Sequence, residues 1–199
     1  YDLAGFCVGA VERENILTGN KISEGNIILG IASSGLHSNG FSLVRKIIKK
    51  AGLTYSNEAP FQPSLTLAEA LLVPTKIYVE GILAAIKTGG ICGLAHITGG
   101  GLLDNIPRIL PNGLGVEIDA KKWVLPSVFK WLAKEGNITV NEMARTFNCG
   151  IGMIVIVEKS HAEFIKQTLI KCHEQVSTIG RIVKCKTNEV IIANTENQW

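Results

Sequence analysis

A histidine, two hydroxyl residues and an asparagine stand close together in residues 33–40, Ser-Ser-Gly-Leu-His-Ser-Asn-Gly. A strand that leads into a helix through such residues presents free backbone N–H groups at the start of the helix, where anions are favoured. His37 adds an imidazole, and Ser38 and Asn39 add hydrogen-bond donors. An N-cap made by Ser38 or Asn39, together with a tight turn, is the alternative interpretation.

A second glycine-rich stretch covers residues 96–101 and begins with His96. Three consecutive glycines cost conformational entropy, so such a run indicates that a phosphate or another chain segment approaches the backbone closely. The stretch matches neither a Walker P-loop nor the G-x-G-x-x-G pattern. A close-packed turn without a ligand remains the alternative.

Residues 145–150, Arg-Thr-Phe-Asn-Cys-Gly, form the third stretch. Arg145 can make a bidentate contact with phosphate or carboxylate, and Asn148 offers both a donor and an acceptor. A solvated arginine before a strand is the alternative. Cys149 has no neighbour in the sequence that would lower its pKa, which favours a buried, inert thiol.

Regular elements are predicted on both sides of these loops. A strand over 27–32 precedes the first loop and a helix over about 40–51 follows it, while strands over 92–96 and 151–157 flank the other two loops. Residues 2–11 are predicted to form a strand buried on both faces, and 54–66 an irregular loop. The remaining predictions are helices over about 67–72, 75–88, 126–135 and 160–172, a helical turn or two over 139–143, and strands over 114–118, 177–184 and 189–193. This pattern predicts an α+β (mixed α/β) fold with a mixed sheet packed against helices.

Composition narrows the classes of partner. The 199 residues are 46% hydrophobic and carry a net charge of +3, without a concentrated basic face. The basic cluster at 45–50 alternates with apolar residues and is interpreted as the solvated side of a helix, so we expect no nucleic-acid partner. No apolar run approaches the ~18 residues of a membrane span, so we expect no membrane partner. Five scattered cysteines without zinc spacing predict a reduced, cytoplasmic protein with no metal site of its own.

Several stretches, taken in order, resemble one family over nearly the whole chain. They are residues 1–6 (Tyr-Asp-Leu-Ala-Gly-Phe), 33–46, 74–78 (read as Pro-Thr-x-Ile-Tyr), 95–101 with 105–108, and 145–150. Together they resemble phosphoribosylformylglycinamidine cyclo-ligase, the aminoimidazole ribonucleotide synthetase of purine biosynthesis. The resemblance implies ATP-dependent closure of the imidazole ring of formylglycinamidine ribonucleotide.

The resemblance also implies a division of the enzyme into two α/β halves. Residues 1–12 would be the last strand of an N-terminal half that binds ATP and Mg²⁺ and forms a homodimer. Residues 13–199 would be the C-terminal, substrate-side domain, which takes a small-molecule nucleotide and is inactive alone. A non-catalytic phosphate- or nucleotide-binding module of the same fold is one alternative. Another ATP-dependent synthetase of the superfamily, such as a selenophosphate synthetase or a hydrogenase-maturation dehydratase, is the other.

The reaction implied for the family assigns roles to the three loops. It needs positioning, charge stabilisation of phosphoryl oxygens and proton removal from the attacking nitrogen. His37, His96 and Arg145 are the expected catalytic residues, with either histidine handling a proton or stabilising an oxyanion and Arg145 holding phosphoryl oxygens. The expected substrate- and phosphate-binding residues are Ser34, Gly35, Ser38, Asn39, Thr98, Gly99, Gly100, Gly101 and Asn148.

Overall fold

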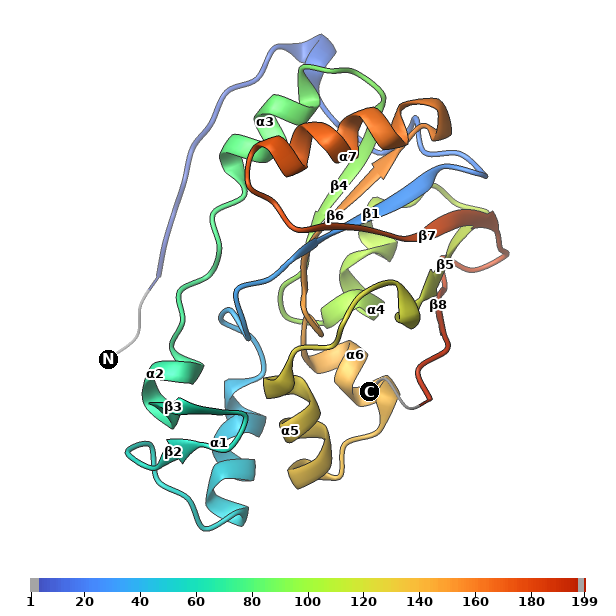
Figure 1. Cartoon of the computed structure of the whole chain (residues 1–199). Helices are drawn as coiled ribbons and strands as arrows, with labels where there is room; N and C mark the ends of the chain where they lie inside the picture. The colour runs from blue at the N-terminus through green and yellow to red at the C-terminus, as the bar shows by residue number, and fades with distance from the viewer. Residues whose placement is uncertain (1–3, 197–198) are drawn as a thin grey trace.

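A computed structural model describes residues 4–196 and 199 of the chain, and its main feature is a six-stranded mixed sheet (Figure 1). The strand order is β4-β6-β1-β7-β5-β8. All neighbouring pairs are antiparallel except β5 and β8, which are parallel. The strands are β1 (Ile27–Ala32), β4 (Ile91–His96), β5 (Leu114–Asp119), β6 (Ile151–Val157), β7 (Val176–Lys184) and β8 (Val190–Ala193). The predicted fold class is therefore confirmed, and the six predicted strands from 27–32 onward form within one residue of their expected ends.

Helices cover parts of both faces of the sheet. The helices are α1 (Phe41–Lys50), α2 (Leu67–Leu71), α3 (Val79–Ile86), α4 (Gly101–Asn105), α5 (Ser127–Gly136), α6 (Val140–Thr146) and α7 (Ala162–Lys171). On one face, α3 and α7 bury Ile82 and Leu169 against Leu29 of β1. On the other face, Ile28 of β1 packs in a core that includes Leu102 of α4. Because alternate residues of a strand point to opposite faces, β1 is buried on both sides.

A helical lobe lies below the sheet in the view of Figure 1 and contains α1, α2 and α5. Its separate core joins Val44 and Ile47 of α1 to Phe129 and Leu132 of α5. The basic residues of α1 lie on its exposed side, as predicted: they are Arg45, Lys46, Lys49 and Lys50. Residues 33–40 connect the sheet to α1, and residues 147–150 lead from α6 back into β6. Two of the three polar loops therefore cross the junction between the sheet and this lobe.

Several predicted elements are wrong in type or extent. Residues 4–11 are irregular and exposed instead of forming a buried strand, because no strand of the described chain pairs with them; residues 1–3 lie outside the described residues. The predicted loop 54–66 contains a hairpin of β2 (Glu58–Ala59) and β3 (Gln62–Thr66), in which Pro63 needs no ladder donor at an edge. The predicted helix 75–88 begins only at Val79, since residues 72–78 form an irregular segment held by contacts described below.

Two helix ends near the candidate loops also differ from prediction. Gly40, in the left-handed conformation, precedes α1, so neither Ser38 nor Asn39 is the N-cap. Helix α6 continues through Thr146, which places Arg145 in its last turn and not in a loop. Short 3-10 turns occur at Arg13–Asn15, Pro107–Ile109, Ala120–Lys122 and Lys159–His161.

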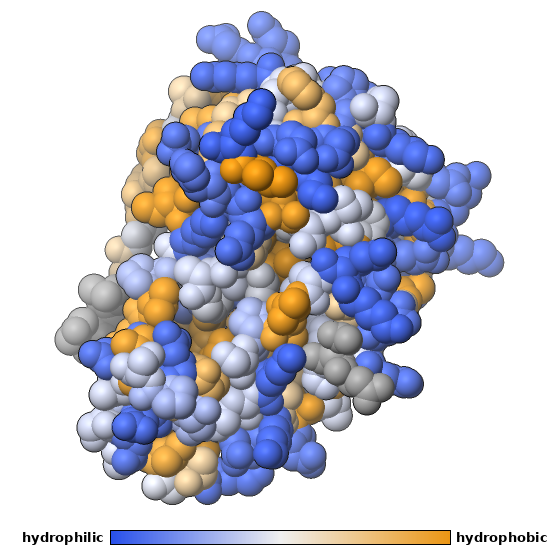
Figure 2. Space-filling model, in the orientation of Figure 1, coloured by the Kyte–Doolittle hydropathy of each residue, from blue (hydrophilic) through white to orange (hydrophobic). Residues whose placement is uncertain are grey.

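The surface mixes polar and apolar side chains. Figure 2 shows hydrophilic side chains over much of one face, with apolar patches between them. Apolar side chains are strongly exposed on residues 72–78 and on α3, including Leu72, Ile77 and Leu83. No helix in the described parts of the chain is both long and apolar enough to cross a membrane.

Candidate functional site

The first and third polar loops are joined by a network centred on Asn148, whose side chain is fully buried. Its Oδ1 accepts hydrogen bonds from Ser33 Oγ at 3.1 Å and from the Gly150 amide at 2.8 Å. Its Nδ2 donates to the Gly35 carbonyl at 2.8 Å. The Ser33 amide also donates to the Gly150 carbonyl at 2.9 Å. Asn148 therefore fixes the relative position of two loops that are more than a hundred residues apart.

The second loop reaches the same region through backbone contacts. Asn39 Nδ2 donates to the Ile97 carbonyl at 3.5 Å, and the Ile97 amide donates to the Gly152 carbonyl at 2.9 Å. Asn105 of α4 holds the glycine turn from inside, because its Nδ2 donates to the carbonyls of Thr98, Gly99 and Gly101. All three predicted loops thus meet at one end of the sheet.

The three glycines of the second loop have different surroundings. Gly101 is buried with φ +56, and a Cβ there would collide with the carbonyl oxygens of Ala144 and Phe147. A close approach by another chain segment explains this glycine without a ligand. Gly100 has φ +99 and lies against Asp104. Gly99 is exposed, and a Cβ there would meet no atom within 4 Å. Only Gly99 leaves the backbone open to a ligand.

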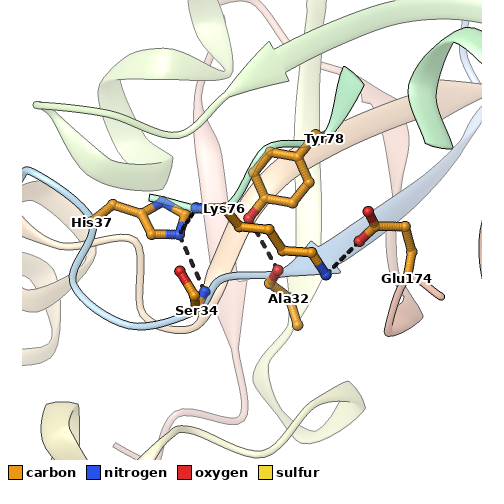
Figure 3. Close-up of polar contacts among 6 residues, drawn as sticks. All are labelled: Ala32, Ser34, His37, Lys76, Tyr78 and Glu174. Atoms are coloured by element: carbon orange, nitrogen blue, oxygen red, sulfur yellow. Dashed lines mark hydrogen bonds and ion pairs between the residues drawn. The ribbon is translucent and has the colours of Figure 1, made fainter. Parts of the chain in front are cut away.

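His37 lies where the first loop meets β4 and the irregular residues 72–78, and only 5% of its surface is exposed. Its Nε2 accepts from the Ser34 amide at 3.2 Å and, over a longer 3.5 Å, from the Lys76 amide (Figure 3). Burial lowers the pKa of His37 to about 4, and the nearby charges of His96 and Lys76 act in the same direction. The imidazole is therefore neutral at physiological pH.

His96, the second predicted histidine, is exposed at the end of β4. Its ring centroid lies 6.4 Å from that of His37 and 6.0 Å from that of Tyr78. The structure therefore brings the two predicted histidines together: His37 is buried, and His96 faces the solvent.

Three residues around His37 were not predicted as site residues. The Tyr78 hydroxyl donates to the Ala32 carbonyl at 3.0 Å, and burial, followed by the charge of Glu174, raises the pKa of Tyr78. Lys76 Nζ lies 2.6 Å from Glu174 Oε2, and the Glu174 side chain is almost fully buried (Figure 3). Tyr78 closes the Pro-Thr-x-Ile-Tyr stretch that resembles the cyclo-ligase, whereas no pattern in the sequence singled out Lys76 or Glu174.

These contacts explain why residues 72–78 are irregular instead of helical. The Lys76 amide and side chain both have partners, on His37 and Glu174, and the Tyr78 hydroxyl has its partner on Ala32. Gly152 of β6 supports the same arrangement, since a Cβ there would collide with the Tyr78 hydroxyl and come 2.7 Å from His37 Cε1.

Arg145 lies beside the glycine turn of the second loop, because its partner Asp104 lies against Gly100. Its guanidinium is exposed and lies 3.8 Å from Asp104 Oδ1. It lines a groove of about 500 Å³ between α4, α6 and the start of β8, together with Leu103, Asn141, Asn188 and Glu189. Its expected place in the third loop is wrong, because the helix ends one residue later than Arg145. Ser34 and Ser38 are exposed, and the Ser34 hydroxyl donates to the Pro74 carbonyl at 2.7 Å.

Backbone strain is present in both loops that Asn148 joins. His37 has φ +56 and Cys149 has φ +49, a region that costs most non-glycine residues of order 1–3 kcal/mol and is often found at functional sites. Cys149 is fully buried, and burial raises the pKa of its thiol. Its side chain is therefore unreactive, which agrees with the interpretation from sequence.

Comparison with known families assigns the chain at the level of its domain. The sequence pattern described as "AIR synthase related protein, C-terminal domain" matches residues 23–193. The chain belongs to this family. The match covers all six strands of the large sheet and all three polar loops.

Solved structures share the fold at low sequence identity. Thiamine-monophosphate kinase from Stenotrophomonas maltophilia K279a is 15% identical with a TM-score of 0.63, covering 92% of this chain and 54% of the kinase. HypE of E. coli, a hydrogenase maturation protein, is 17% identical with a TM-score of 0.54, covering 88% and 48%. T. maritima PurL complexed with FGAR is 15% identical with a TM-score of 0.56, covering 92% and 28%. The chain therefore spans about half of the first two proteins and about a quarter of PurL.

Metal ligands are not grouped in the described parts of the chain. No set of three or more His, Cys, Asp or Glu side chains is placed to hold an ion there. The cyclo-ligase resemblance assigns Mg²⁺ to an N-terminal half and not to these residues.

Proposed function

We propose that this chain is the substrate-side part of an ATP-dependent cyclo-ligase that closes the imidazole ring of formylglycinamidine ribonucleotide. The observation that carries the proposal is the meeting of the three polar loops around His37 and Asn148. Membership of the AIR synthase related family supports it at the level of the superfamily. The sequences of the three loops, which resemble those of the cyclo-ligase, are the reason for choosing this reaction. The T. maritima PurL structure, which shares the fold, was solved with FGAR bound.

The loops would bind the nucleotide in two ways. Thr98, Gly99 and Gly100 would face its phosphate, since Gly99 leaves the backbone open. Ser34, Ser38 and Asn39 would orient the rest of the molecule, because the two serines are exposed. Gly35, Gly101 and Asn148 would act by holding the loops, since their polar or backbone groups already have partners within the chain.

Ring closure asks little covalent chemistry of these residues. ATP would activate the amide oxygen as a phosphoryl ester, after which the amidine nitrogen attacks and phosphate leaves. The side chains of this chain would orient the reacting groups and stabilise charge on oxygen. Arg145 would take part only from the groove beside Asp104, so it supports the proposal less directly than the histidine pair.

The remaining parts of the proposal concern the cofactors, the dimer and the location of the protein. ATP and Mg²⁺ would bind to an N-terminal α/β half, which would also form a homodimer, and residues 1–12 would belong to that half. No step of the chemistry proposed for this chain passes through a metal. The five cysteines, none of which is in a disulfide, suit a cytoplasmic protein.

Calorimetric titration of the chain with formylglycinamidine ribonucleotide tests the proposal. We expect saturable binding that Asn39→Ala weakens about tenfold, as expected for loss of a hydrogen bond to a charged or strongly polar ligand. Asn141→Ala is the matched control, because Asn141 is exposed on α6 and lines the Arg145 groove. Absence of binding would contradict the proposal, and so would weakening by Asn141→Ala but not by Asn39→Ala. Preference for thiamine monophosphate would favour another reaction of the superfamily.

A further inference from the structure

The buried imidazole of His37 has one nitrogen with partners and one without. Nε2 faces two backbone amides, of Ser34 and Lys76. Within the described residues, Nδ1 is buried and has no hydrogen-bond partner. A buried polar atom without a partner is costly, so its position in a candidate site points to a ligand.

The partners of Nε2 determine which nitrogen carries the proton. A backbone amide can only donate a hydrogen bond, so Nε2 must present its lone pair to Ser34 and Lys76. In a neutral imidazole the other nitrogen is then the donor, which fixes the Nδ1–H tautomer. Protonation of Nε2 would place its N–H opposite the two amide N–H groups, so both hydrogen bonds would be lost. The ring therefore has no free lone pair with which to remove a proton.

The surroundings also disfavour an imidazolium at this position. His96 from β4 and Lys76 from the irregular segment are the basic groups nearby, and both lower the pKa of His37. Tyr78, whose ring centroid lies 6.2 Å away, donates its hydroxyl proton to Ala32. Glu174, the acid of the cluster, is paired with Lys76. None of these groups supplies the partner that a charged His37 would need.

We infer that His37 serves this site as a neutral hydrogen-bond donor, through Nδ1–H, to an acceptor oxygen of the bound nucleotide, and not as a proton-transfer group. This inference rests on the proposed function for the identity of the ligand, whereas the tautomer rests on the contacts alone. A neutral donor stabilises charge that develops on oxygen without giving up its proton. The shared chemistry is an accepting oxygen, carried either by the amide group or by the phosphate of the nucleotide.

Nitrogen NMR of the chain labelled with ¹⁵N-histidine tests the tautomer directly. We expect His37 to show a protonated Nδ1 and an unprotonated Nε2, with signals that stay constant from pH 8 to pH 5.5. A protonated Nε2, or titration near the ordinary histidine pKa, would overturn the inference. Titrations with formylglycinamidine ribonucleotide and with inorganic phosphate then identify the acceptor. A shift of the Nδ1 signal with both ligands indicates a phosphate oxygen, and a shift with the nucleotide alone indicates the amide group; no shift with either would overturn the donor role.

Two variants separate the two nitrogens of the ring. His37→Asn keeps an N–H near the position of Nδ1 and suits the left-handed backbone, whereas His37→Gln can reach the Nε2 position and replaces its acceptor. We expect nucleotide affinity to fall at most about threefold in the first variant and about tenfold or more in the second. The reverse order would overturn the inference. If the wild-type chain binds phosphate but not the nucleotide, the proposed function fails while the tautomer and donor role are still decided by the spectra.

Discussion

At the scale of single residues, the site depends on two buried polar side chains, one with all its polar atoms hydrogen-bonded within the chain and one without. Asn148 uses both its oxygen and its nitrogen within the chain, so it stabilises the loops. His37 uses only Nε2, and its Nδ1 is left for a partner outside the described chain. The first arrangement makes the second possible, because a donor is useful to a ligand only if the surrounding loops hold it in place.

The lowered pKa of His37 predicts a pH-dependent stability. In the unfolded chain His37 takes up a proton near its ordinary pKa of 6.5, but in the folded chain only near 4. Between these values the unfolded state binds more protons, so folding stability is full above about pH 6.5 and falls as the pH falls toward 4. The contribution of His37 to this loss reaches roughly 3.5 kcal/mol once the pH is below 4, because the pKa is lowered by about 2.5 units and each unit corresponds to about 1.4 kcal/mol.

Urea unfolding of the wild type and of His37→Asn at pH 7, 5.5 and 4.5 measures this contribution. As the pH falls, the wild type should lose more unfolding free energy than the variant. The difference between the two proteins should approach the contribution of His37 given above. His161 and His173 are common to both proteins and cancel in the difference, whereas the charge of His96 acts on His37 and is part of the measured effect. Parallel pH profiles would show that His37 is not held neutral by the fold.

At the scale of elements, the glycine turn before α4 separates a packing requirement from a binding one. Gly101 is required by the contact between α4 and α6, since the carbonyl oxygens of Ala144 and Phe147 occupy the space of a side chain. Gly99 faces open space in the same turn. One turn therefore offers a structural glycine and a candidate ligand-facing glycine two residues apart.

Alanine at Gly101 should lower the stability of the fold, whereas alanine at Gly99 should lower the affinity for the nucleotide. Gly101→Ala should lower the free energy of unfolding by about 2–4 kcal/mol, from overpacking and a left-handed backbone. Gly99→Ala should change it by less than about 0.5 kcal/mol, as for ordinary surface positions. Its new methyl group should nevertheless weaken nucleotide binding several-fold. Urea unfolding and calorimetry measure the two effects, and equal destabilisation by both variants would show that the turn is not packed as described.

Much of this element-level arrangement was predictable from sequence. The apolar runs of β1 and β6 and the helical spacing of α1 located the three loops, because strand and helix patterns reflect burial directly. The roles of Tyr78 and Glu174 were not predictable, since they depend on contacts between segments far apart in the chain. Arg145 was predicted in a loop because nothing in residues 139–146 marks where α6 ends. Residues 2–11 were predicted as a strand because an apolar segment has the sequence pattern of a strand whether or not a neighbour pairs with it.

At the scale of the whole molecule, the site lies where the sheet meets the helical lobe. The sheet has a hydrophobic core on each face, and the lobe of α1 and α5 has a third. The first and third polar loops connect the sheet to the lobe, so a ligand bound among them would contact residues from both. The groove lined by Arg145 and Asn188 lies between α4, α6 and the start of β8, and is the natural competitor for the same ligand.

A map of amide chemical-shift changes on titration with formylglycinamidine ribonucleotide distinguishes these two places most directly. The proposed site predicts that the largest changes fall in residues 34–39, 98–100 and 148–150, with a coincident change at Nδ1 of His37. Changes confined to Asn141, Arg145 and residues 188–190, or no changes at saturating nucleotide, would contradict the proposal that the three loops form the substrate site.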